Sequence, residues 1–132
     1  MKEILNKLKS ALKDLETEDG IVLLFALFLR EEALGKWDLL VSASWLDSRT
    51  LDSYERISKA VQKYLDDKEI VQLARIVILD ADDPAVAFLQ DLHPVPNGSF
   101  VEVPNCEPPS DKFGFTIKRG YILRCVRENQ GY

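Results

Sequence analysis

The stretch KWDLLVSASW, residues 36–45, decides the fold, because here the hydrophobic pattern takes on the period of a strand. Its odd-numbered residues are all apolar, namely Trp37, Leu39, Val41, Ala43 and Trp45. Most of its even-numbered residues are polar. Since successive side chains of a strand point to opposite faces, the pattern predicts a strand with one apolar face and one mostly polar face.

A helix and a second strand follow this segment. Residues 51–65 repeat apolar side chains at helical spacing, and Thr50 stands where the N-cap of that helix is expected. Residues 74–79 are the most apolar part of the next strand. A strand, a helix and a strand at this spacing predict a βαβ unit, in which the two strands are parallel and the crossover is right-handed.

Two helices are expected before this unit. Residues 2–16 place apolar side chains at intervals of three and four, which predicts an amphipathic helix lying on the core. Residues 17–35 contain the run IVLLFALFL, whose periodicity does not separate a buried strand from a buried helix. Leucine and alanine are strong helix formers and fill five of its nine positions, and Gly35 stands where a helix would end. We therefore predict a buried helix here.

The C-terminal part supplies a short helix and more strands. We expect the helix at residues 85–92 and a short edge strand at residues 99–103. The end of the chain predicts a hairpin, with arms at residues 113–117 and 121–126 and a turn at residues 118–120.

These elements together predict an α+β fold. We expect a mixed β-sheet of four to five strands with a βαβ unit and a C-terminal hairpin, and helices packed on the sheet. No internal repeat or linker divides the chain, so residues 1–132 are expected to form a single domain.

Composition narrows the partners and the compartment. The net charge is −5, and an acidic surface disfavours nucleic acid, whose binding depends on lysine and arginine. The longest apolar run has nine residues, against about 20 for a membrane span. We expect no membrane association and, since no signal peptide is evident, a cytoplasmic location.

Acidic residues after the second strand form the main candidate site. Asp83 precedes a proline and fits the N-cap of the following helix, whereas capping explains Asp82 in part and Asp80 not at all. Ligands of parallel sheets gather at the carboxyl ends of the strands, and there Ser44 and Asp47 are expected near Asp80. Such oxygens suit Mg²⁺, so Asp80 is a weak candidate for a metal ligand; no other cofactor is predicted.

An apolar run followed by Asp80 and Asp82 resembles the nucleophile motif of haloacid-dehalogenase-like phosphatases, in which an aspartate attacks phosphate. The resemblance covers only these few residues. That motif has threonine or valine two places after the second aspartate, where this chain has Pro84, and its strand lies near the start of the chain. With these departures the motif does not place the chain in that family.

Other candidates suggest contact with a protein. Trp37 and Trp45 bracket the first strand and are natural interface anchors. Arg119 and Arg124 belong to a basic C-terminal segment, which suits an acidic partner or a second copy of the chain.

We therefore interpret the protein as a small cytoplasmic binding or interaction domain without an evident catalytic constellation. It is expected to form a homodimer or other homo-oligomer, or to act as an accessory to another protein. The alternative is a divalent-cation-dependent enzyme of the hydrolase or phosphoryl-transfer type, which would use Asp80 and Asp82 at the ends of the strands.

Overall fold

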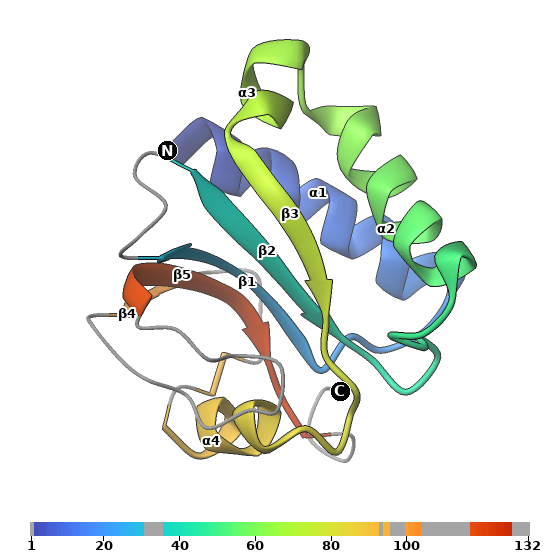
Figure 1. Ribbon diagram of the computed structural model, residues 1–132, viewed down its shortest axis with the longest axis vertical. Helices are drawn as coiled ribbons and strands as arrows, with labels where there is room; N and C mark the ends of the chain where they lie inside the picture. The colour runs from blue at the N-terminus through green and yellow to red at the C-terminus, as the bar shows by residue number, and fades with distance from the viewer. Residues whose placement is uncertain (1, 31–35, 93, 96–99, 104–116, 128–132) are drawn as a thin grey trace.

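The computed structural model describes residues 2–30, 36–92, 94–95, 100–103 and 117–127 (Figure 1). The described residues form four helices and five strands. In chain order the elements are α1 (Lys2–Glu18), β1 (Leu24–Arg30), β2 (Trp37–Ser42), α2 (Leu51–Tyr64), α3 (Asp67–Val71), β3 (Leu73–Ile78), α4 (Pro84–Leu92), β4 (Val101–Val103) and β5 (Ile117–Cys125).

The strands form one mixed sheet in the order β3-β2-β1-β5-β4. Strand β3 lies parallel to β2, and α2 and α3 connect the two, which confirms the predicted βαβ unit. Strand β1 is antiparallel to β2 and to β5, and β4 is antiparallel to β5. The predicted α+β class with a mixed sheet is therefore confirmed, with β3 and β4 at its two edges.

Helices cover both faces of the sheet (Figure 1). Helices α1 and α2 lie on one face, where Leu8 and Ile57 share a core with Phe25. Helix α4 lies on the other face, where Leu89 shares a second core with Phe28. None of the described helices is long and apolar enough to cross a lipid bilayer.

The prediction of a buried helix at residues 17–35 is wrong. Helix α1 continues to Glu18, and Leu24–Arg30 form strand β1. This strand has a neighbour on each side and a helical layer on each face, so all of its side chains except that of Arg30, which is not described, are buried. A strand buried on both faces needs a continuous apolar run, and its pairing overrides the helix propensity of leucine. Residues 31–35, with Gly35, lie outside the described part of the chain.

The predicted polar face of β2 is also wrong. All six residues of the strand are buried, and the exposed fraction of Asp38 is only 1%. The strand ends at Ser42, so Trp45 lies in the turn that follows and not on the strand. Alternation predicted the direction of the side chains correctly, but a second layer on the sheet covers the face that was expected to meet water.

The predicted hairpin turn at residues 118–120 does not exist, because these residues lie inside β5. The first arm at 113–116 lies outside the described residues, whereas the edge strand expected at 99–103 is confirmed for Val101–Val103. Gly120 serves packing and not a turn: it pairs with Phe28, whose ring lies over the glycine.

We expect Gly120→Ala to destabilise the fold. A Cβ atom at this position would overlap the Phe28 ring and would lie 2.9 Å from the carbonyl oxygen of Leu27, so a central strand would have to move. Overpacking of this kind costs about 1–3 kcal/mol of unfolding free energy, measurable by urea denaturation. Lys118→Ala on the same strand is the control, and its exposed side chain predicts a change within about 0.5 kcal/mol. Equal stabilities of the two variants would contradict this account of Gly120.

Candidate functional site

The parallel strands β2 and β3 have their carboxyl ends at the same end of the sheet. The loops that follow the two strands meet there. The backbone N–H of Leu79 donates to the carbonyl of Val41 at 2.9 Å. Further along, the Ser48 hydroxyl donates to Oδ1 of the half-buried Asp80 at 2.7 Å. The loops after β2 and β3 therefore meet at the carboxyl ends of the strands as predicted, and we call this place the rim. The hydroxyl that contacts Asp80 there comes from Ser48 and not from Ser44.

The other predicted members of this site lie differently. Ser44 is exposed in the turn after β2. The Asp47 carboxylate accepts hydrogen bonds from the backbone N–H and the Nε of Arg49, at 2.9 and 3.2 Å. The Asp47 backbone N–H donates to the Ser53 hydroxyl at 3.0 Å. This hydrogen bond connects the loop after β2 to the first turn of α2.

Asp83 caps α4 as predicted, since its Oδ1 accepts a hydrogen bond of 2.9 Å from the N–H of Ala85. Asp82 beside it is exposed. In the part of the chain that the structure describes, no three His, Cys, Asp or Glu residues are grouped so that they could hold a metal ion. Local structure thus accounts for much of the acidic cluster after β3.

The structure brings Trp37 and Arg119 together. The Arg119 guanidinium lies 5.6 Å from the ring centroid of Trp37. The Tyr121 ring contacts the rings of both Trp37 and Phe100, at centroid distances of 5.6 and 5.9 Å. Only 5% of Trp37 is exposed, so this tryptophan is a core residue with a cation over one face. It offers little area to a partner.

Trp45 and Arg124 serve the fold at other places. The Trp45 Nε1 donates to the carbonyl of Ile21 at 3.0 Å. Arg124 is buried, and its Nε lies 3.1 Å from the Glu16 carboxylate, which also accepts a 3.0 Å hydrogen bond from the N–H of Val22. Arg124 therefore joins β5 to α1 and is not part of an exposed basic surface.

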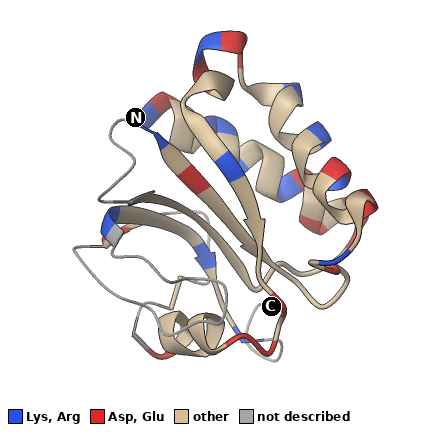
Figure 2. Cartoon of the chain, in the orientation of Figure 1, with Lys and Arg blue, Asp and Glu red and all other residues tan. Residues whose placement is uncertain are grey.

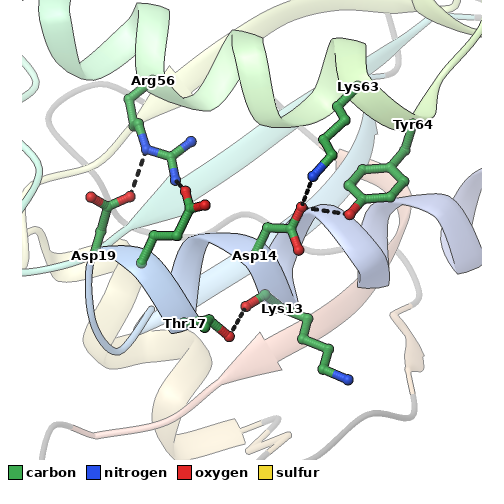
Figure 3. A network of polar contacts seen from close by, with 8 residues as sticks. Lys13, Asp14, Thr17, Asp19, Arg56, Lys63 and Tyr64 are labelled. Atoms are coloured by element: carbon green, nitrogen blue, oxygen red, sulfur yellow. Dashed lines mark hydrogen bonds and ion pairs between the residues drawn. The ribbon is translucent and has the colours of Figure 1, made fainter.

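A polar network holds α1 against α2 (Figure 3). The Asp14 carboxylate accepts hydrogen bonds from the Lys63 ammonium at 2.9 Å and from the Tyr64 hydroxyl at 2.5 Å. One turn away, Arg56 donates to Asp19 and to Glu18, each at 2.6 Å. The hydrogen bond from Tyr64, followed by that from Lys63, lowers the pKa of Asp14. This network fastens α1 to α2.

The surface that the sequence did not reveal is the outer edge of β3. No other strand pairs with this edge within the described ranges, and the strand is only partly buried until Ile78. A groove of about 250 Å³ runs between β3 and α2 beside it. The groove is lined by Tyr54, Ser58, Val61, Gln62, Ile70, Leu73, Arg75 and Ile76. Val71, the last residue of α3, is 64% exposed, so an apolar side chain also lies on the surface close to the start of β3.

Charge is sparse along this edge. Strand β3 carries one charged residue, the blue segment in an otherwise tan strand in Figure 2. This residue is Arg75, whose Nε lies 3.3 Å from the buried carboxylate of Asp38 on β2. The ion pair neutralises the only charge of the strand. Sequence pattern predicted the strand itself, but its place at the edge depends on strand order, for which the sequence holds no local signal.

Comparison of the chain with protein-family models, with curated proteins and with solved structures found no match in any of the three.

The α1–α2 network predicts a pH dependence of stability. Because the folded pKa of Asp14 is lowered, its charge stabilises the fold above its ordinary pKa of 3.8, and this contribution is lost as pH falls through the folded pKa. The free energy of unfolding of wild type should thus exceed that of Asp14→Asn at neutral pH, and the difference should shrink in acid. Urea titrations at a series of pH values measure it. In a Tyr64→Phe background the pH-dependent part should be smaller, since the largest cause is removed; a difference independent of pH would refute the assignment.

Proposed function

We propose that this protein is a small interaction domain that docks an extended segment of another chain on the outer edge of β3. The observation that carries the proposal is the edge itself, a six-residue strand of mainly apolar residues with no strand paired to its outer side among the described residues. The groove beside it offers room for the partner's side chains.

An open edge strand presents a row of backbone N–H and C=O groups, which a second extended chain can pair with. In binding by strand addition, these backbone bonds supply affinity and pockets for alternate side chains supply specificity. The groove between β3 and α2 is such a pocket, because Ile70, Leu73 and Ile76 line it with apolar surface. The partner is therefore expected to place an apolar side chain there.

The two edges of the sheet are not equivalent. Strand β4, at the opposite edge, has three residues, and very short edge strands are one way in which proteins prevent unwanted pairing. Strand β3 has twice that length. A charged side chain is another protection, but Arg75 is drawn to Asp38 of the neighbouring strand. Strand β3 is therefore the edge better suited to docking.

The direction of the backbone groups on β3 follows from its pairing with β2. The N–H of Leu79 donates to β2, and alternate residues of a parallel strand face the same neighbour. Val77 therefore faces β2, while Ile76 directs its N–H and C=O outward. Proline is tolerated in an edge strand where the lost N–H faces outward. Ile76→Pro thus blocks strand addition without removing a bond inside the sheet.

We expect extended peptides selected for binding to wild type to lose affinity for Ile76→Pro. Ile76→Ala is the matched control, because both variants lose the side chain and only proline removes the outward donor. The dissociation constant, measured by fluorescence anisotropy, should rise about tenfold more for the proline than for the alanine variant, since a hydrogen bond is lost and the ring obstructs pairing. Val77→Pro, which removes a bond to β2, should destabilise the fold itself. Selected peptides that bind Ile76→Pro as well as Ile76→Ala would show that docking occurs elsewhere.

The second candidate function is a divalent-cation-dependent enzyme. The observation in its favour is that the loops after β2 and β3 meet at Asp80, where Ser48 supplies a hydroxyl. Two observations stand against it. The Asp83 carboxylate serves as the N-cap of α4, and no group of three metal-ligating side chains occurs in the described residues. Strand docking therefore has the stronger support, and a cytoplasmic location for either function rests on the sequence.

Mg²⁺ distinguishes the two functions. A docking domain predicts that Mg²⁺ changes the melting temperature of wild type and of Asp80→Ala by the same amount, relative to EDTA. The comparison uses the shift in each protein, because Asp80→Ala also removes the hydrogen bond from Ser48 and lowers the melting temperature by itself. Differential scanning calorimetry with and without the ion measures it. A stabilisation seen in wild type and absent in Asp80→Ala would favour the enzyme.

A further inference from the structure

We infer that the segment docked on β3 is strand β3 of a second copy of this chain, paired antiparallel about a two-fold axis at Ile76. This inference rests on the proposed docking function and names its partner. It joins two sheets edge to edge into one continuous sheet, with the helices of both copies on corresponding faces.

Symmetry restricts how the two strands can pair. A two-fold axis perpendicular to the sheet keeps each face on its own side, and directly opposite residues of antiparallel strands share a face. The axis must therefore pass between a residue and its own copy. At Ile76 the backbone N–H and C=O both point outward, so the two isoleucines exchange a pair of hydrogen bonds. This register places Arg75 opposite Val77.

The neighbouring registers are less favourable. An axis at Arg75 would set two arginines directly opposite each other, and like charges in that position destabilise a strand pair. An axis at Val77 would pair Arg75 with Leu79, beyond the end of the strand at Ile78, and would shorten the overlap. The axis at Ile76 pairs residues 74–78 of the two copies, a longer overlap than the axis at Val77 gives, and places Arg75 opposite Val77 and not opposite its own copy.

Charge also favours a second copy at this surface. Each chain carries a net charge of −5, so two copies repel each other over most of their surfaces. Of the eight residues that line the groove, only Arg75 is charged, and Asp38 neutralises it at 3.3 Å. Surfaces without net charge are where two identical acidic chains approach at the least electrostatic cost, and depletion of charge marks the centre of protein interfaces.

The side chains fit the same arrangement. Ile76 is half-buried, packs against the core beneath α1 and α2, and lines the groove. Because the axis keeps both α2 helices on one side of the joined sheet, the two grooves face each other across it. The exposed part of each Ile76 side chain then meets its copy, and the uncharged Tyr54, Ser58 and Gln62 of each α2 flank the contact.

Sedimentation equilibrium of the full chain tests the inference. Wild type should show a reversible monomer–dimer equilibrium. Ile76→Pro should raise the dimer dissociation constant about tenfold or more above that of Ile76→Ala, because the symmetry removes the donor from both strands. A wild-type protein that stays monomeric at all concentrations, or a dimer that the proline does not weaken relative to alanine, would overturn the inference.

Amide hydrogen exchange is a second test of the dimer. It uses only the wild-type protein, so its result does not depend on whether Ile76→Pro folds. The Ile76 amide should exchange more slowly as protein concentration rises, whereas the Val77 amide, bonded within the sheet, should respond little. Concentration-independent exchange at Ile76 would contradict strand pairing. If wild type is monomeric while selected peptides still bind at β3, the dimer inference is wrong and the proposed docking function stands. If neither a second copy nor a selected peptide binds at β3, both proposals fail.

Discussion

The burial of β1 on both faces is the constraint on which the rest of the structure depends. Its side chains alternate between two cores, with Phe25 and Leu27 on the side of α1 and α2, and Ala26 and Phe28 on the side of α4. Both flanks are paired, with β2 and with β5. A strand in this position needs helices on each face, and its two neighbours leave β3 and β4 to form the edges.

Local signals predicted the elements that depend on local chemistry. The amphipathic period of α1, the βαβ spacing and the cap at Asp83 all concern residues close together in the chain. The failures have non-local causes. Strand β1 shows no alternation of apolar and polar residues because both of its faces are buried. Gly120 resembles a turn residue, but its role is to make room for the Phe28 ring. Pairing partners distant in sequence decide both cases.

The candidate site shows the same division. Parallel pairing of β2 and β3 placed Asp80 at the predicted rim, but contact with the next loop comes from Ser48, four residues beyond the expected Ser44. Arg124 looked like part of a basic surface, yet it is buried against Glu16. That β3 stands at an edge follows from strand order, which depends on how β1 pairs and cannot be read from the residues of β3.

The acidic residues that suggested a metal site make structural contacts beside the proposed docking surface. Ser48 and Asp80 tie the loop before α2 to the end of β3, and Asp47 orders that loop through Ser53 in the first turn of α2. Asp83 caps α4, which begins at Pro84 after the loop that follows β3. These contacts fix β3 relative to α2, and the groove lies between those two elements. In the proposed docking function, these contacts hold the start of α2 and the end of β3 together and so support the surface on which Ile76 is proposed to pair.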